Sequence, residues 1–290
     1  MMNNQPVIVG GVGGSGTRII SEALIHMGVD MGHTLNHASD NLLFTLMFKR
    51  KEWLLKNIDR PEIVAPVIKT FAHLSGAETS LTMVDVQIIA FTFFDWMRHK
   101  ETVEGLGRRF AYKNFLKVVK NRRQKQSDGA LWGFKEPNSW LLLRHFLKAY
   151  PDLKYIHTIR HGIDMSLSEN QQQCINWSRH VLNEDITASS CTPRLSFKYW
   201  VKANQSVLNF GQQLPSSQFL VIRFEDLCES PDETMLRLIE FLNVDISEDT
   251  RARVLGLPEA TKCMRKYQDK DLIHYDDEDL DALPGLGYHV

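Results

Sequence analysis

The chain has 290 residues, of which 43% are apolar and 24% charged, and this composition excludes a disordered or collagen-like protein. Its 34 basic and 35 acidic residues leave a net charge of −1, so the charge balance does not predict binding to nucleic acid, which needs an excess of cations. No segment approaches the roughly 20 consecutive apolar residues that span a membrane.

The predicted elements alternate between strands and helices, apart from one long helical block. Residues 7–9 form a β-branched strand, and a glycine-rich loop at 10–16 and a helix at 17–27 follow it. The block at 40–126 predicts helices at 42–56, 65–74, 81–99 and 106–119. Strands are then predicted at 131–134, 154–159 and 219–222, and helices at 138–150, 163–173, 195–210 and 231–242.

This order predicts an α/β fold of three layers, in which helices cover both faces of a central, mostly parallel sheet. The polar segments between elements contain no convincing linker, so we expect one domain over residues 1–290. The helical block at 40–126 is longer than one crossover needs, and we interpret it as an insertion that caps the site.

The glycine-rich loop Gly11-Val12-Gly13-Gly14-Ser15-Gly16 allows three interpretations. The pattern G-x-G-x-x-G suggests a dinucleotide site, but no clear second strand carries the required acidic residue. A magnesium–ATP loop requires Lys-Ser/Thr where Thr17-Arg18 stand, and no strand ends in a metal-binding Asp. Anion binding by the backbone amides, Ser15, Thr17 and Arg18 uses only what is present, and we favour it.

Two further basic residues end predicted strands. Lys135 follows the strand at 131–134, and Arg160 follows the strand at 154–159. Because ligands of parallel sheets bind at the carboxyl ends of the strands, both side chains are expected at the crevice that the glycine loop lines. Ser168 lies eight residues after Arg160, and the predicted helix would return it beside the arginine as a second phosphate site.

This combination resembles the sulfotransferases that use 3′-phosphoadenosine-5′-phosphosulfate (PAPS). The resemblance implies that Gly13, Gly14, Ser15, Gly16, Thr17 and Arg18 bind the 5′-phosphosulfate, and that Arg160 and Ser168 bind the 3′-phosphate. Residues 219–227, Phe-Leu-Val-Ile-Arg-Phe-Glu-Asp-Leu, are similar to a later family segment, with Phe224 in place of a tyrosine. The implied reaction moves a sulfuryl group from PAPS to a hydroxyl or amine and leaves the nucleotide PAP.

The chain departs from the family pattern at two places. Many members carry Lys or Arg where Gly14 stands, so Arg18 or Lys135 would supply that charge. The family's C-terminal Gly-x-x-Gly-x-Trp-Lys element is missing, and Arg265-Lys266 are the substitutes that we consider for the 3′-phosphate.

The resemblance also implies catalytic roles. Lys135 would stabilise the charge that develops on the leaving oxygen, and a general base would take the acceptor proton. Asp40 is the first candidate for this base and His37 the second, while a helix N-cap is the structural alternative for Asp40. The competing functions are a small-molecule kinase that uses magnesium–ATP and a nucleotide-binding protein that has lost transfer.

The remaining expectations concern partners and location. We expect a small-molecule, glycan or peptide acceptor, no metal and no nucleic acid; the sequence leaves the acceptor and the oligomeric state open. The four cysteines are widely spaced and form no zinc pattern, and no signal peptide is evident, so we expect a cytoplasmic protein.

Overall fold

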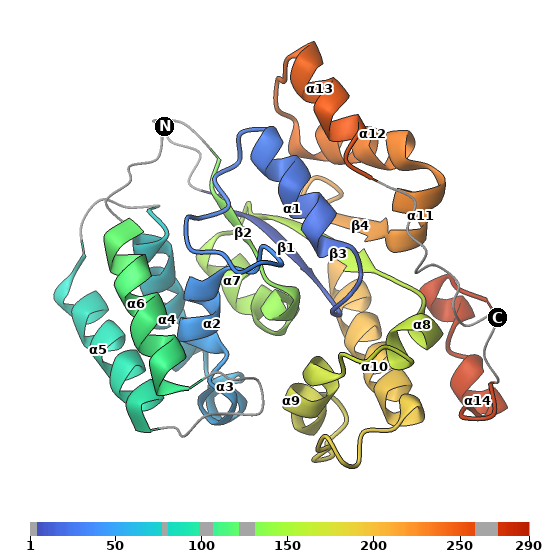
Figure 1. The fold of residues 1–290 in the computed structure, drawn as a ribbon, viewed down its shortest axis with the longest axis horizontal. Helices are drawn as coiled ribbons and strands as arrows, with labels where there is room; N and C mark the ends of the chain where they lie inside the picture. The colour runs from blue at the N-terminus through green and yellow to red at the C-terminus, as the bar shows by residue number, and fades with distance from the viewer. Residues whose placement is uncertain (1–4, 77–80, 99–106, 122–130, 259–271, 290) are drawn as a thin grey trace. The chain divides into compact units, whose positions relative to one another are not determined.

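The structure is a computed structural model that describes residues 5–76, 81–98, 107–121, 131–258 and 272–289 (Figure 1). Contacts divide the chain into two compact units. The first unit comprises Met1–Ile8, Gly28–Glu136 and Leu141–Leu153, and the second comprises Val9–Met27, Pro137–Trp140 and Lys154–Val290. The single domain expected over residues 1–290 stays a prediction.

A four-stranded sheet has the order β2-β1-β3-β4. The strands are β1 (Val7–Gly11), β2 (Gly133–Lys135), β3 (Lys154–Ile159) and β4 (Phe219–Arg223). In the second unit β3 and β4 are parallel, with Tyr155 opposite Phe219 and their rings stacked at 5.9 Å between centroids. Helices flank this mostly parallel sheet, so the predicted α/β class is confirmed.

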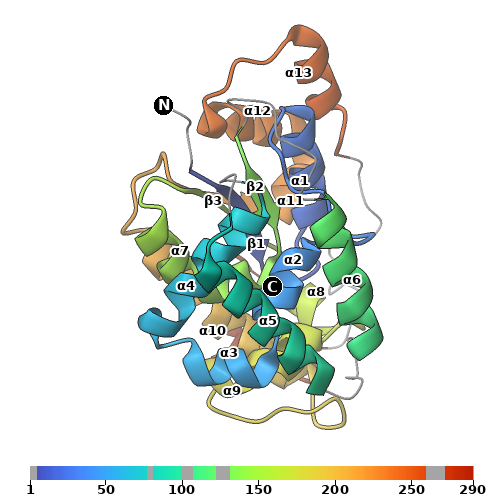
Figure 2. The same ribbon diagram turned by 90° about the vertical axis from the view of Figure 1, so that its left-hand side faces the viewer.

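The first unit is mainly helical. Its helices are α2 (Leu42–Phe48), α3 (Lys51–Asn57), α4 (Pro61–Leu74), α5 (Met83–Arg98), α6 (Arg108–Asn121) and α7 (Leu143–Ala149) (Figure 2). Its core is a cluster of buried phenylalanines from α2, α4, β2 and α7, in which Phe71 lies edge-on to Phe134 at 4.9 Å. Such aromatic packing buries a large apolar area and holds helices from distant parts of the sequence together.

The second unit contains the remaining α-helices. These are α1 (Thr17–His26), α8 (Gly162–Ser166), α9 (Gln172–Val181), α10 (Pro193–Gly211), α11 (Phe224–Glu229), α12 (Pro231–Leu242), α13 (Glu248–Leu255) and α14 (Asp277–Leu280). The described residues also form 3₁₀ helices η1 (Pro137–Leu142), which begins in this unit and ends in the first, and η3 (Pro284–Leu286). Local signals begin the longest helix: Thr192 caps α10 by accepting a hydrogen bond from Leu195 N, and Pro193 occupies the first turn.

Two predicted helices are wrong as continuous elements. The helix expected at 42–56 breaks between α2 and α3, because the Arg50 side chain donates to the carbonyl of Met47 and ends α2. The helix expected at 163–173 ends at Ser166, and α9 begins only at Gln172. There the Gln171 amide donates to the carbonyls of Met165, Ser166 and Ser168, which replaces the helical hydrogen bonds.

The C-terminal part of the described chain contains short helical elements. Beyond residue 256 these are α14 and η3. Asp279 of α14 is buried and accepts a hydrogen bond from Arg194 Nε at 2.6 Å, so it anchors α14 to α10. None of the helices in the described ranges is long and apolar enough to cross a membrane.

Candidate functional site

The glycine-rich loop of the second unit adopts a backbone that requires glycine. Gly14 and Gly16 have φ values of 80° and 87°, in the left-handed region that L side chains adopt only at a cost. A Cβ atom on Gly11 would collide with the carbonyl oxygen of Thr158, and one on Gly16 would lie 2.9 Å from the Phe224 ring. The loop therefore fits closely against β3 and α11, while Gly14 is exposed.

The Ser15 hydroxyl stabilises this loop rather than facing a ligand. Ser15 is buried, and its Oγ lies 2.8 Å from Thr158 Oγ1. Thr158 in turn donates to the carbonyl of Gly10, so the single Ser15 proton is used in the bond to Thr158. Any contact from Ser15 to an anion would thus come from its backbone amide.

The N-terminus of α1 follows this loop directly. Gly16 is the N-cap residue, and no side chain caps the helix. The first amides of a helix lack partners within it and carry a partial positive charge, which makes such a helix start a site for anions. Thr17 is buried at this start, whereas Arg18 points to an exposed position and pairs with Glu22 at 3.0 Å. Arg18 must leave Glu22 before it can contact a ligand.

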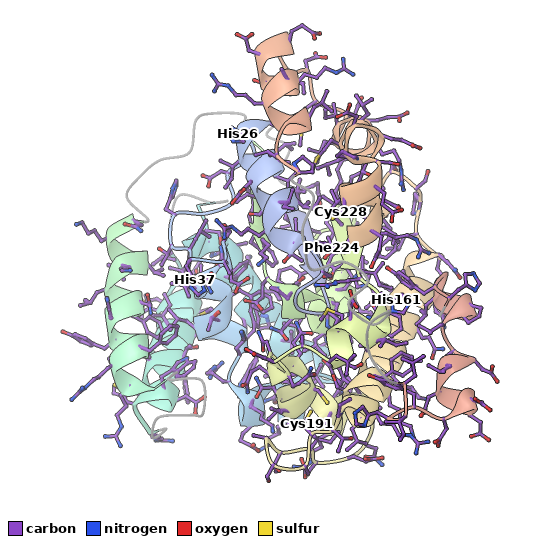
Figure 3. The ribbon with its side chains drawn as sticks, turned by 45° about the vertical axis from the view of Figure 1, so that its right-hand side comes forward. His26, His37, His161, Cys191, Phe224 and Cys228 are labelled. Atoms are coloured by element: carbon purple, nitrogen blue, oxygen red, sulfur yellow. The ribbon has the colours of Figure 1, made fainter. Side chains whose placement is uncertain are left out.

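Arg160 is a rigidly held cation in the same unit. Its side chain is 12% exposed, and its guanidinium donates to Asp164 Oδ2 at 2.8 Å. The guanidinium carbon also lies 4.8 Å from the centre of the Phe224 ring. Figure 3 labels Phe224 and the neighbouring His161. A guanidinium oriented by a carboxylate and an aromatic face presents a planar donor group whose geometry matches phosphate oxygens.

The turn after Arg160 is fixed by the C-terminal segment. The backbone N–H of His161 donates to Glu225 Oε1, and the hydroxyl of Tyr288 donates to Glu225 Oε2 at 3.0 Å. The His161 ring donates from Nε2 to the carbonyl of His289 and accepts at Nδ1 from Ile163 N. Burial lowers the pKa of His161, which keeps the ring in the neutral form that both bonds require. Sequence reasoning missed this network because no local pattern links residues so far apart.

Ser168 does not return to Arg160 on a helix, which corrects the expectation from the spacing. It lies in the loop between α8 and α9, where its hydroxyl donates to the carbonyl of Asn170 at 3.3 Å. Helix α8 ends at Ser166, two residues before Ser168. A role for Ser168 in phosphate binding therefore depends on this loop and not on helical geometry.

Gln173 is a candidate that sequence reasoning did not identify. Its amide lies over the glycine loop, 3.6 Å from the place of a Cβ atom on Gly13. Its Oε1 is buried and has no hydrogen-bond partner among the described residues. A buried acceptor without a partner is costly, so this oxygen is well suited to receive a donor from a ligand.

In the first unit the structure brings Lys135 and Asp40 together. The Lys135 ammonium, at the end of β2, forms an ion pair with Asp40 Oδ1 and donates to the carbonyl of Ala38 at 2.9 Å. Asn36 Nδ2 donates to Asp40 Oδ2 at 2.9 Å. Lys135 and Asp40 lie 95 positions apart, and the sequence predicted each of them separately as a catalytic candidate.

The structural alternatives for both residues are wrong. Asn41, not Asp40, is the N-cap of α2, because its side chain accepts from Phe44 N at 2.9 Å. A surface lysine paired with the neighbouring Glu136 is the structural alternative for Lys135, but Lys135 is buried and pairs with Asp40, and Glu136 lies 3.7 Å from Lys49. His37 is exposed in the loop that carries Asp40. The pair thus combines a buried cation with a carboxylate that remains partly accessible, since the Asp40 side chain is 19% exposed.

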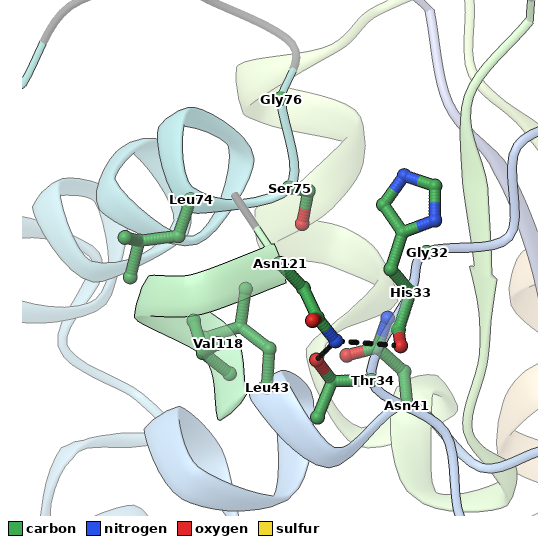
Figure 4. A pocket seen from close by; sticks show the side chains of 10 residues that line it. All are labelled: Gly32, His33, Thr34, Asn41, Leu43, Leu74, Ser75, Gly76, Val118 and Asn121. Atoms are coloured by element: carbon green, nitrogen blue, oxygen red, sulfur yellow. Dashed lines mark hydrogen bonds between the residues drawn. The ribbon is translucent and has the colours of Figure 1, made fainter. Parts of the chain in front are cut away.

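A small cavity lies beside this loop in the first unit (Figure 4). Asn121 Nδ2, on its wall, donates to the carbonyl of His33 at 3.0 Å and to Thr34 Oγ1 at 3.1 Å. The cavity measures about 40 Å³, which has room for water but not for a sugar or aromatic acceptor. These bonds instead join the C-terminal end of α6 to the segment that leads to Asp40.

Two further expectations concern other parts of the chain. Arg265 and Lys266, considered for the 3′-phosphate, lie outside the described residues. Within the described ranges, no group of three or more His, Cys, Asp or Glu residues is arranged to hold a metal ion.

Comparison with known proteins identifies the family. No curated protein matches the chain. Among solved structures, the "Sulfotransferase Domain from the Curacin Biosynthetic Pathway" has a TM-score of 0.52 and 17% identity, and the match covers 99% of each chain. The "Sulfotransferase Domain from the Synechococcus PCC 7002 Olefin Synthase" has a TM-score of 0.51 and 16% identity, covering 100% of this chain and 97% of the other. These two matches show the fold. A family model described as "Sulfotransferase family" matches residues 6–248, and the chain therefore belongs to the sulfotransferase family.

Proposed function

We propose that this sulfotransferase takes its sulfuryl group from PAPS and binds that nucleotide through its second unit. The observation that carries the proposal is the glycine loop at the start of α1, in the same unit as the restrained guanidinium of Arg160. Two anion-binding features suit a nucleotide that bears phosphate groups at both its 5′ and 3′ positions.

The residues of the second unit fit such a nucleotide chemically. The left-handed glycines leave room for close approach to the backbone amides at residues 13–17, where a Cβ on Gly14 or Gly16 would be strained. Arg160 has a planar donor fork that matches phosphate oxygens. The unpartnered Oε1 of Gln173 can accept a hydrogen bond from a ribose hydroxyl or an adenine amino group.

PAPS supplies an activated sulfuryl group and leaves as PAP. The loop amides and Thr17 hold the 5′-phosphosulfate, and Arg160, with Ser168, holds the 3′-phosphate. Arg18 adds positive charge once it leaves Glu22. The part of these residues is to bind and orient two anions before any chemistry occurs.

Lys135 and Asp40 of the first unit are proposed as the groups that assist transfer. The Lys135 ammonium stabilises negative charge on the leaving oxygen, and Asp40 accepts the proton of the acceptor hydroxyl or amine. Their ion pair provides a cation for one task and a carboxylate for the other. Asn36 holds Asp40 Oδ2 at 2.9 Å, which restricts the direction in which the carboxylate accepts the proton.

Calorimetric titration with PAP, ADP, NAD and magnesium–ATP tests the nucleotide assignment. We expect PAP to bind more tightly than the others, without metal, and Arg160→Ala to weaken it by about 10- to 100-fold, since a charged hydrogen bond contributes roughly 1.5–3 kcal/mol. Arg237→Ala is the matched control, because Arg237 is half exposed and lies 3.9 Å from Asp226. Preference for magnesium–ATP would indicate a kinase, and preference for NAD a dinucleotide site.

A screen of alcohols, phenols, sugars, amines and peptides with labelled PAPS would then identify the acceptor. PAP binding without transfer to any of them would support the alternative of a nucleotide-binding protein that has lost catalysis. We also propose a cytoplasmic location, consistent with the free thiols of Cys174, Cys191 and Cys228, which fractionation of cells that express the chain would test.

A further inference from the structure

Helices α5 and α6 of the first unit present an apolar surface to the outside. They pack side by side (Figure 2). Phe93 of α5 lies edge-on to Phe115 of α6, with 5.5 Å between the ring centroids. Large side chains on the outer side remain exposed, among them Phe91 at 78% and Phe94 at 61%. A soluble protein rarely exposes several aromatic and aliphatic side chains together, and such a surface indicates a binding partner.

We define the apolar face by six of the exposed apolar side chains of α5 and α6: Met83, Phe91, Phe94, Tyr112, Leu116 and Val119. On α6 the last three lie four and three positions apart, a spacing that places them along one stripe of the helix. On α5 the spacing of 8 and 11 residues from Met83 to Phe91 and Phe94 likewise gives one stripe. Other sides of both helices are packed, since Trp96 on α5 and Ala111 and Val118 on α6 are buried.

Cations border the stripe on α6. This helix carries Arg108, Arg109, Lys113, Lys117 and Lys120, all exposed, and its sequence contains no Asp or Glu. Lys113 and Lys117 lie one turn apart beside Tyr112 and Leu116. An exposed helix with Phe, Tyr or Leu on one side and Lys or Arg beside it has the composition of helices that lie in a membrane interface.

The acidic residues of α5 do not offset these cations at the surface. Asp85 is buried and accepts hydrogen bonds from Thr70 and Thr82. Asp95 forms an ion pair with the buried Arg50 at 2.8 Å. Both carboxylates are therefore engaged with partners inside the unit, and the outer surface of the two helices keeps its positive charge.

From this arrangement we propose that the apolar face and its cations bind the surface of an anionic membrane. The cations attract acidic lipid headgroups, and the apolar side chains enter the boundary with the acyl chains. A symmetric dimer through this face is disfavoured, because the same cations of two copies would face one another. The proposal concerns association with a membrane surface and does not depend on the nucleotide or the acceptor.

Co-sedimentation of the full chain with vesicles tests this proposal. We expect it to bind vesicles of phosphatidylcholine and phosphatidylserine, but not vesicles of phosphatidylcholine alone. The double variant Lys113→Glu, Lys117→Glu should weaken binding by at least about 30-fold, because each cation near an anionic surface contributes about fivefold. The double variant Phe91→Ser, Phe94→Ser should weaken it by at least about tenfold through lost apolar burial.

Matched controls come from helices and segments other than α5 and α6. Lys202→Glu on α10, combined with Lys148→Glu on α7 of the first unit, changes the net charge equally at exposed sites away from α5 and α6. Leu236→Ser with Ile273→Ser removes two other exposed apolar side chains. Both controls should bind vesicles as the original chain does, and circular dichroism checks that every variant is folded.

Three results would overturn the proposal. These are no sedimentation of the original chain with either vesicle, equal binding to neutral and anionic vesicles, and unchanged binding of both test variants. Light scattering provides a separate check. A dimer that dissociates when Phe91 and Phe94 are replaced would assign the face to a second copy instead of a membrane.

Discussion

Replacement of Lys135 by methionine removes one charge while retaining most of the side-chain volume. The Lys135 side chain is 3% exposed, and its ammonium donates to the carbonyl of Ala38 and forms an ion pair with Asp40. If it stabilises the developing charge, turnover should fall by about 10²–10³-fold, or roughly 2.7–4 kcal/mol. PAP affinity should change by less than about threefold, because the residues proposed to bind the nucleotide belong to the second unit.

The stability cost of the same replacement can be estimated from the ion pair. Removing one partner of a fully buried pair costs about 3–5 kcal/mol. Asp40 is 19% exposed and keeps its hydrogen bond from Asn36, so we expect a smaller loss of about 1–3 kcal/mol. A domain with an unfolding free energy of about 5–15 kcal/mol remains folded after this loss, and urea unfolding measures it.

Lys49→Met is the matched control for this experiment. Lys49 is 18% exposed and lies 3.7 Å from Glu136, so its replacement also removes a lysine from an ion pair in the first unit. Single-turnover assays with labelled PAPS and an acceptor from the screen would compare the two variants. The Lys135 variant should be slow and the Lys49 variant close to the original rate.

A second variant shows whether Lys135 and Asp40 act together. Asp40→Asn should also slow transfer, and the double variant should be hardly slower than the slower single variant, because residues that act as a unit have non-additive effects. Near-normal turnover of a folded Lys135→Met protein would refute the catalytic assignment. Equal rate losses in the Lys135 and Lys49 variants would refute it as well, since a general structural effect would explain both.

Other predictions concern the loop and two buried groups. Gly11→Ala should abolish PAP binding in calorimetry, because its Cβ would meet the Thr158 carbonyl. Gly14→Ala should cost only about 1–2 kcal/mol of stability through its left-handed φ, because Met165 lies no nearer than 3.4 Å to the added Cβ. Equal loss of PAP binding in the two variants would contradict this account of the loop. Burial lowers the pKa of His157 to about 4, below the unfolded value near 6.5, so its neutral form stabilises the fold above pH 6.5 and this contribution is lost as the pH falls toward 4. The unfolding free energy in urea should therefore drop by about 2 kcal/mol between pH 7 and 4.5, and a His157→Gln variant that keeps the same slope would disprove the assignment. Burial opposes ionisation of Asp85, but hydrogen bonds from Thr70, Thr82 and His73 outweigh this effect and lower the pKa of Asp85. The ionised carboxylate therefore stabilises the fold at pH values above its unfolded-state pKa, and this contribution is lost as the pH falls below about 4. Thermal melts of Asp85→Asn should show a lower Tm at pH 7, and an unchanged Tm would contradict this assignment.

Much of the fold could be predicted because its signals are local. The β-branched run before Gly10 predicts a strand, and the glycines that follow predict a turn with left-handed residues. The strand Lys154–Ile159 and the helix Pro231–Leu242 have the bounds expected from the sequence. A proline in the first helical turn and a helical repeat of apolar residues mark the latter without any tertiary contact.

The errors occur where a side chain competes with the regular backbone pattern. Residues 163–173 have helical periodicity, yet the Gln171 amide takes over three carbonyls and the helix ends at Ser166. Arg50 ends α2 in the same way and also pairs with Asp95, 45 residues away. Periodicity reports which face of a segment is apolar, but it does not report which distant side chain will bind its carbonyls.

Local patterns of residues predict the strand–loop–helix that suits an anion, the α/β order and the family resemblance, because each depends on residue types at short spacing. Packing in three dimensions decided that Lys135 pairs with Asp40, that the Ser15 hydroxyl bonds to Thr158, and that Tyr288 supports the turn after Arg160 through Glu225. It also decided that the apolar side chains of α5 and α6 remain outside. These contacts join residues far apart in the chain, and their partners are selected by packing and by the cost of leaving buried polar groups unpaired, which no local pattern records.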